Sequence, residues 1–315
     1  MATDGADHRV LVTGASGFVG TRLMGRLQQS ACGVMGLVGP NGTNAPAAVD
    51  LTDSVALARV IADFSPTTVV HLAAMSSVGD GSVTPQTVWK VNFDGTRSLA
   101  QAMLALPHPA RMIFASSGEV YGRHFNAGPC DETSALLPAS PYARSKTACE
   151  YLLADMASET LPVVVLRLFN HTGAGQDERF VAPSFAAQIA RAMRDGGEEI
   201  HVGNLDAVRD FSDVEDIIDA YMAVIEDDRP SPAFDIYNVG SGRPIAIQHL
   251  LDVLVEESGR PIRAMPVAER MRASDVPRAE GVFAKFRDRY GWSANTPLRT
   301  TAAAVLKHEV DRHSG

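Results

Sequence analysis

The stretch that decides the fold runs Arg9-Val10-Leu11-Val12-Thr13-Gly14-Ala15-Ser16-Gly17-Phe18-Val19-Gly20. Its first five residues are a short β-branched run that predicts a strand, and residues 21–27 after it predict a helix. Glycines at three-residue spacing between a strand and a helix let the backbone turn tightly and approach a pyrophosphate. The amides at the start of the helix then face the phosphates. The sequence therefore predicts a dinucleotide site that comprises Gly14, Ser16, Gly17, Phe18, Val19 and Gly20.

Outward from this stretch, apolar runs recur at 33–38, 69–74, 111–117 and 163–169 and alternate with helical segments. This alternation predicts an α/β fold of the Rossmann type, with a doubly wound parallel sheet. Beyond residue 167 the chain turns into a polar, glycine-containing loop and then an amphipathic helix near 183–194. We expect a dinucleotide-binding domain formed by 1–167 with 212–240. A smaller, interleaved C-terminal domain formed by 168–211 and 241–315 would bind the substrate.

The composition favours a globular enzyme. The chain has 315 residues, 45% of them hydrophobic, and a net charge of −9, which argues against a nucleic-acid surface. Its three cysteines, Cys32, Cys130 and Cys149, are too scattered for a disulfide framework or a metal site. We find no signal peptide and no apolar run that approaches a membrane span. The expected location is cytoplasmic, and neither a membrane nor a metal is expected.

The end of the second predicted strand bears on the cofactor. NAD sites usually place a carboxylate there to hold the ribose hydroxyls, but Val38 is followed by Gly39-Pro40-Asn41-Gly42. The missing acid favours NADP(H), whereas no arginine occupies the turn, so NAD(H) stays open. The pair Asp50-Leu51 would place a carboxylate near the adenine, although an aspartate before a helix is as often a cap.

A tyrosine and a lysine stand four residues apart in Ser140-Pro141-Tyr142-Ala143-Arg144-Ser145-Lys146. The segment reads as a helix, so Tyr142 and Lys146 share one face. A neighbouring cation stabilises a phenolate, and we expect Lys146 to lower the pKa of Tyr142 for proton transfer. Ser117 ends a predicted strand at the edge where doubly wound sheets bind ligands. We interpret His71, alone in an apolar run, as a hydrogen-bonded core histidine rather than a catalytic one.

The chain resembles the extended short-chain dehydrogenase/reductases that act on nucleotide sugars. The resemblance covers nearly the whole chain and rests on TGASGFVG (13–20), HLAA (71–74), Asn92, SSGEVYG (116–122), PYARSK (141–146), RLFN (167–170) and RDF (209–211). The run FNHTGAGQ, the residues 179–185 and Gly203-Asn204-Leu205 are similar to the GDP-4-keto-6-deoxy-D-mannose reductases within that family. This resemblance implies an NADPH-dependent reduction of a 4-keto group that yields GDP-D-rhamnose. It also implies that the protein forms a homodimer.

The resemblance also implies roles for individual residues. Ser117 would hydrogen-bond the substrate carbonyl, Tyr142 would donate a proton, Lys146 would hold the nicotinamide ribose, and Glu119 stands where related dehydratases carry an acid. The implied cofactor contacts are Leu72, Ala73, Ala74 and Asn92, besides Asp50, Leu51, Tyr142, Lys146 and the glycine stretch. The implied substrate contacts are Ser76, Ser117, Glu119, Asn170, Arg179, Val181, Ser184, Arg209 and Arg272.

Three alternatives to the reductase stay open. A 4,6-dehydratase needs an additional acid or base, and only Glu119 is placed to supply it, because Gly118 offers no second acid. A 4-epimerase of the same family is a further possibility. A catalytically silent, cofactor-sensing protein would have the same fold. The intact Ser117, Tyr142 and Lys146 favour catalysis, since a sensor has no need of a proton donor.

Overall fold

The computed structural model describes residues 8–30, 32–40, 47–75, 84–271 and 276–314. The chain divides into two compact units, and each is described by itself. Unit 1 comprises 1–122, 136–168 and 220–237, and unit 2 comprises 123–135, 169–219 and 238–315. The chain therefore passes repeatedly from one unit to the other.

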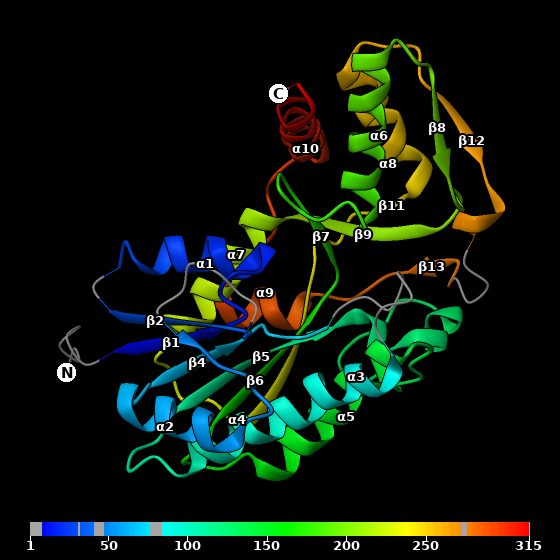
Figure 1. Ribbon diagram of the computed structural model, residues 1–315. Coiled ribbons are helices and arrows are strands. Elements are labelled where there is room, and N and C mark those ends of the chain that lie inside the picture. Colours follow the sequence, from blue (N-terminus) through cyan, green and yellow to red (C-terminus); the bar gives the residue numbers. More distant parts are fainter. Residues whose placement is uncertain (1–7, 31, 41–46, 76–83, 272–275, 315) are drawn as a thin grey trace. The chain divides into compact units, whose positions relative to one another are not determined.

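Unit 1 is built on a seven-stranded sheet with the strand order β10-β6-β5-β4-β1-β2-β3 (Figure 1). The strands are β1 (Arg9–Thr13), β2 (Gly33–Val38), β3 (Ala47–Ala48), β4 (Thr68–His71), β5 (Arg111–Ser117), β6 (Val163–Leu168) and β10 (Phe234–Val239). Successive neighbours from β6 to β3 pair in parallel. The strand order reverses between β1 and β4, the switch point at which such sheets bind ligands. The predicted doubly wound fold is confirmed.

Helices cover both faces of this sheet. α2, α4 and α5 lie on one face and α1 lies on the other (Figure 1). Their bounds are α1 (Phe18–Leu27), α2 (Ser54–Phe64), α3 (Pro85–Trp89), α4 (Gly95–Leu104) and α5 (Pro141–Met156), with a π-helical turn η1 (Lys90–Asp94) and a 3-10 turn η2 (Gly118–Val120). Among the described residues, no helix combines the length and apolar character needed to cross a membrane.

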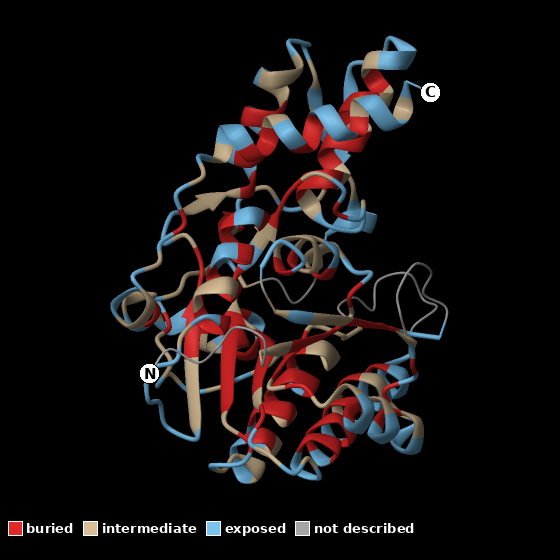
Figure 2. Cartoon of the chain, turned by 90° about the vertical axis from the view of Figure 1, so that its left-hand side faces the viewer, coloured by how far each residue is buried: buried red, intermediate tan, exposed pale blue. Residues whose placement is uncertain are grey.

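The core of unit 1 explains why its strands read as continuous apolar runs. A parallel sheet covered by helices is buried on both faces, so successive residues need not alternate. Val10, Leu11 and Val12 in β1 are fully buried, as are Val69 and Val70 in β4. Figure 2 shows these central strands as largely buried, while the outer helices expose one side. The helices contribute Leu57, Ile61, Leu99, Met103 and Leu153 to the same cluster.

Unit 2 has a small mixed sheet of its own. β9 (Val208–Asp213) is antiparallel to β11 (Pro244–Ala246) and parallel to β7 (Asn170–Thr172) and β13 (Arg278–Ala279). A parallel pair, β8 (Glu199–Val202) and β12 (Arg263–Pro266), stands apart. α6 (Val181–Asp195), α8 (Ile247–Ser258) and α10 (Leu298–His313) pack together around a second core. The remaining elements are η3 (Gly122–Ala127), α7 (Val214–Ile225), η4 (Ala268–Arg270) and α9 (Ala284–Tyr290).

The expected dinucleotide-binding domain includes 212–240, and the strands at the two ends of that segment belong to different sheets. β10 joins the large sheet, but β9 belongs to the small one. The units also depart from the expected domain bounds at 123–135 and 212–219, which group with unit 2. Hydrogen bonds give the reason. The Asn238 side chain donates to the Cys130 carbonyl at 3.0 Å, and Thr301 donates to Asp213 at 2.6 Å.

Candidate active site

The glycine stretch forms a close-fitting turn between β1 and α1. Gly14 has a φ of 70°, and a Cβ added there would lie 2.8 Å from the Ala73 nitrogen. A Cβ at Gly20 would lie 2.1 Å from the Gly14 carbonyl oxygen. Gly17 precedes α1 without a side-chain cap, and the first turn of α1 has no acidic residue. The first amides of a helix have no partner within the helix and favour a phosphate, so this turn fits a dinucleotide.

The expected adenine contacts lie beyond β3. Asp50 is exposed, and one of its carboxylate oxygens accepts hydrogen bonds from the Thr52 nitrogen and hydroxyl, both at 2.8 Å. These bonds lower the pKa of Asp50. Asp53, rather than Asp50, caps α2. Leu51 is buried in the core of unit 1. Residues 41–46 of the turn after β2 lie outside the described residues.

His71 at the end of β4 is completely satisfied. Its two ring nitrogens bond to the Thr13 and Thr96 hydroxyls at 2.7 and 2.9 Å, and 1% of the residue is exposed. Burial lowers the pKa of His71 to about 3, so the ring is neutral at working pH. The expectation of a core histidine is confirmed. Thr13 also accepts a bond from the Ala73 nitrogen at 3.2 Å, which holds the segment 72–74 against the end of β1.

Asn92 lies in the π-helical turn η1, a feature that recurs at functional sites. Its carbonyl accepts bonds from the Thr96 hydroxyl at 2.5 Å and the Cys149 thiol at 3.3 Å. Its side-chain amide donates to the Ser145 hydroxyl at 2.9 Å, and Ser145 donates to the Tyr142 carbonyl at 2.8 Å. This chain of bonds ties η1 to the helix that carries Tyr142.

Unit 1 brings the four expected catalytic residues together. Ser117 ends β5, and its hydroxyl accepts a bond from the Glu119 nitrogen at 3.1 Å. The Tyr142 and Ser117 side chains are hydrogen-bonded to each other. Ser140 caps α5 by accepting from the Ala143 nitrogen at 3.0 Å, and it donates to the Glu119 carboxylate at 3.4 Å. The cap thus connects the first turn of α5 with the acid.

The Lys146 ammonium points into the sheet edge. It donates to the Ala115 carbonyl at 2.6 Å, lies 4.6 Å from the Phe114 ring centre, and is 6.0 Å from that of Tyr142. The residue is 2% exposed. Burial lowers the pKa of Lys146 to about 8, although the charges of Cys149 and Glu150 act in the opposite direction. A lysine with this pKa keeps its charge at neutral pH and loses it in mild alkali.

The pKa of Tyr142 moves against expectation. The sequence predicts that Lys146 lowers it, but burial and then the Glu119 carboxylate raise it, and only the bond with Ser117 acts the other way. Burial of the phenol is the main cause, and the Lys146 ammonium donates to the Ala115 carbonyl, 6.0 Å from the centre of the Tyr142 ring. Tyr142 is therefore firmly protonated, which suits a proton donor better than a proton acceptor.

The expected substrate residues that the structure describes in unit 2 lie on or next to α6, β7 and β9. Val181 and Ser184 are in the first turn of α6, where Ser184 accepts a bond from Arg270 at 3.1 Å. Arg270 was not expected from the sequence. Exposed Arg179 pairs with Asp177 at 2.9 Å. The remaining two, Asn170 and Arg209, lie on β7 and β9. Ser76 and Arg272 are outside the described residues.

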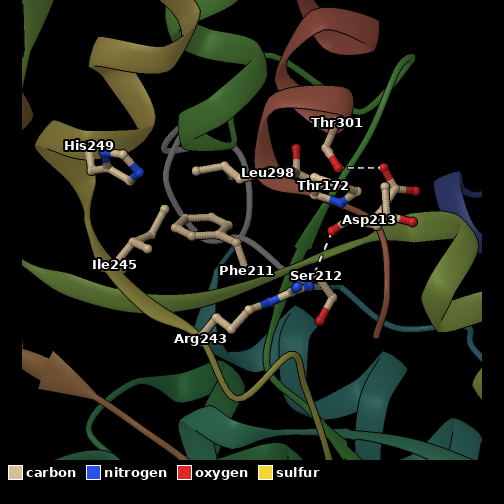
Figure 3. A pocket seen from close by; sticks show the side chains of 11 residues that line it. Thr172, Phe211, Ser212, Asp213, Arg243, Ile245, His249, Leu298 and Thr301 are labelled. Carbon is tan, nitrogen blue, oxygen red and sulfur yellow. Dashed lines mark hydrogen bonds between the residues drawn. The ribbon is translucent and has the colours of Figure 1, made fainter. Parts of the chain in front are cut away.

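Unit 2 also contains a cavity of about 290 Å³, which we did not expect although Thr172 and Phe211 of the quoted motifs line it. Figure 3 shows Arg243 and His249 on opposite sides of it, with Phe211 between. The Arg243 guanidinium donates to the carbonyls of Ala294 and Thr296, both at 3.2 Å. None of the expected substrate residues that the structure describes lines this cavity.

Comparison with known proteins places these features in context. The model of the family described as "NAD dependent epimerase/dehydratase family" matches residues 10–240. The GDP-6-deoxy-D-mannose reductase of Pseudomonas aeruginosa is 33% identical over 303 residues, which is 95% of this chain and 96% of that protein.

Two solved structures are similar throughout. That of RMD from Pseudomonas aeruginosa, complexed with NADPH, has a TM-score of 0.84 and 31% identity, and covers 97% of this chain and 99% of its own. That of the Thermus thermophilus UDP-glucose 4-epimerase in complex with NAD has a TM-score of 0.82 and 27% identity, and covers 96% and 98%.

Proposed function

We propose that this chain, which belongs to the NAD dependent epimerase/dehydratase family, reduces the 4-keto group of a GDP-linked 4-keto-6-deoxyhexose with NADPH. The product from GDP-4-keto-6-deoxy-D-mannose would be GDP-D-rhamnose. The observation that carries the proposal is the protonated Tyr142 hydrogen-bonded to Ser117, at the edge of a sheet whose glycine turn fits a dinucleotide. The similarity of the chain to a GDP-6-deoxy-D-mannose reductase supports GDP as the nucleotide and a 6-deoxyhexose as the sugar of the substrate.

The residues divide the chemistry among them. The amides at the start of α1 and the tight turn at Gly14 would hold the pyrophosphate of the cofactor. NADPH, when bound, supplies the hydride that reduces the sugar carbonyl. Ser117 donates a hydrogen bond to the carbonyl oxygen, and Tyr142 donates the proton that this oxygen takes up. Lys146 would hold the nicotinamide ribose, and its positive charge, 6.0 Å from the centre of the Tyr142 ring, would stabilise the phenolate that Tyr142 leaves behind.

NADPH is proposed over NADH for two reasons. The described end of β2, at Val38, is followed by Gly39 and Pro40 rather than a carboxylate that would repel a 2′-phosphate. The similar structure of RMD is complexed with NADPH, whereas that of the epimerase is complexed with NAD. A comparison of kcat/KM for the two cofactors tests this choice, and a clear preference for NADH would contradict it.

Dehydration is the second candidate, and Glu119 is the observation that favours it. The carboxylate is exposed and accepts a hydrogen bond from the Ser140 hydroxyl. Its charge raises the pKa of Tyr142, so an acid does stand near the phenol. A dehydratase oxidises C4, eliminates water and returns the hydride, which requires proton transfer at more than one atom. Gly118 provides no second acid. A reductase needs only the donor that Tyr142 supplies.

Two parallel reactions separate these candidates. One contains GDP-mannose and the enzyme supplied with NAD(P), and the other contains GDP-4-keto-6-deoxy-D-mannose with NADPH. We expect NADPH absorbance to fall only in the second reaction, with one equivalent consumed for each product formed. Formation of the 4-keto sugar from GDP-mannose without net cofactor consumption would establish the dehydratase instead. No turnover with either substrate, despite NADPH binding, would leave a cofactor-sensing role.

A further inference from the structure

A buried ion pair is hydrogen-bonded to residues that neighbour the expected catalytic residues of unit 1 in the sequence. Glu150 and Arg167 are each 3% exposed and joined by hydrogen bonds of 3.1 and 2.6 Å to one carboxylate oxygen, with a third of 3.2 Å to the other. Glu150 is on α5, four residues after Lys146 and eight after Tyr142, so all three side chains share one helix face. The pair therefore joins the catalytic helix to β6.

Two further hydrogen bonds extend from this pair to the segment that carries Ser117 and Glu119. The Ser116 hydroxyl donates to Glu150, and Arg167 lies opposite Ser116 in the pairing of β5 with β6. Arg167 donates to the Tyr121 hydroxyl at 2.9 Å, and its guanidinium lies 5.0 Å from the centre of that ring. Ser116 and Tyr121 stand immediately before and after the residues 117–120. One buried cluster thus joins α5, which carries Tyr142 and Lys146, to the segment that carries Ser117 and Glu119.

We propose that Ser116, Tyr121, Glu150 and Arg167, here called the Glu150 anchor, are positioning residues that fix the Tyr142 helix against the Ser117 segment. The inference rests on the proposed function for the reaction that it serves. Ser117 and Tyr142 lie on separate elements, and the anchor joins these elements by bonds between Glu150 of α5 and Ser116 of β5 and between Arg167 and Tyr121. All four of its residues are buried to 97% or more, so the anchor acts through Ser117, Glu119 and Tyr142 and makes no contact with substrate.

The ion pair in the anchor suggests that its role is to fix geometry as well as to stabilise the fold. Removing two charges from water costs several kcal/mol, and apolar residues of similar volume often stabilise a core as well or better. What an apolar pair lacks is direction, because only the forked guanidinium can bond Glu150 and Tyr121 in fixed geometry. A displacement of about 1 Å at reacting groups can lower turnover about 100-fold. Geometry is therefore the benefit that this arrangement offers.

Tyr121→Phe tests the anchor with a single deleted oxygen, and Tyr237→Phe is its matched control. Tyr237 is also in unit 1, is 3% exposed, and donates to Asp235 at 2.6 Å at the outer strand β10. We expect Tyr121→Phe to lower kcat about 10-fold, with the NADPH Kd changed less than twofold. The deuterium isotope effect with 4-deuterated NADPH should rise, because hydride transfer becomes slower. Tyr237→Phe should lose similar thermal stability and keep kcat and the isotope effect.

Hydrogen exchange gives a readout that needs no substrate. Tyr121→Phe and Ser116→Ala should speed amide exchange in 117–121 and in the first turn of α5, and Tyr237→Phe should leave both unchanged. Unchanged exchange in these segments, or equal kcat in Tyr121→Phe and Tyr237→Phe, would overturn the anchor. Failure of the wild-type protein to reduce the 4-keto sugar would instead reject the proposed function, and the exchange experiment would still decide the anchor.

Discussion

Tyr142 is surrounded by groups that act on its proton in opposite directions. Burial and Glu119 hold the proton in place, and the Ser117 hydroxyl favours its release. Tyr142→Phe removes only the hydroxyl, so we expect the fold and the NADPH affinity to remain and kcat to fall at least ~100-fold. Steady-state kinetics and NADPH titration measure both quantities. Normal turnover in this variant would show that another group donates the proton.

The pH dependence of the reaction should follow Lys146. Its pKa is lowered to about 8, so the ammonium is present below pH 8 and is lost as the pH rises through that value. We expect kcat/KM for NADPH to be level below pH 8 and to fall about tenfold per pH unit above it. Tyr142, with its raised pKa, stays protonated there, and His71 is neutral throughout. A profile that stays level to pH 10 would contradict the role of Lys146.

Tyr221 supplies a test of stability next to this chemistry. The residue is fully buried, and its hydroxyl has no hydrogen-bond partner within the described part of the chain. An unsatisfied buried hydroxyl costs about 1–3 kcal/mol. Tyr221→Phe should therefore raise the melting temperature by about 2 °C, with kcat unchanged. Calorimetry checks this, and a lower melting temperature would reveal a partner such as an internal water.

At the scale of elements, the start of α5 couples helix formation to catalysis. Ser140 caps the helix that carries Tyr142, and Asp53 caps α2 by accepting from Val55 and Ala56. Ser140→Ala and Asp53→Ala should each cost about 1 kcal/mol in unfolding free energy. Only Ser140→Ala should also lower kcat, because the frayed turn contains Tyr142. Equal kcat in both variants would mean that α5 holds Tyr142 without its cap.

The sequence predicts the elements near strong local signals and misses those set by distant contacts. Residues 9–13 and 33–38 form β1 and β2 as expected, because apolar runs end there at glycines. Ser140-Pro141 is a readable cap signal, because serine is a preferred N-cap residue and proline suits the first helical position. The π-turn at Asn92 and the buried pair of Glu150 with Arg167 depend on partners 53 and 17 residues away. No local pattern encodes such pairs.

At the scale of the whole molecule, the residues expected to hold the two pyrophosphates belong to different units. The glycine turn is in unit 1, and Arg209 lies on β9 of unit 2. An arginine forms bidentate, charge-assisted bonds with a diphosphate. Arg209→Ala should therefore raise the KM for the nucleotide sugar about 10-fold or more, with little change in NADPH affinity. An equal loss of both affinities would indicate that Arg209 supports the fold instead.

The repeated passage of the chain between the units has a consequence during synthesis on the ribosome. β6 is complete at residue 168, but its outer neighbour β10 begins only at residue 234. Until those residues leave the exit tunnel, the nascent sheet ends in an unpaired strand, VVVLRL, whose backbone groups are open to other chains. Translation speed and chaperone supply over this interval should therefore affect the yield of folded protein. Silent codon changes between residues 168 and 239 are the means to adjust that speed.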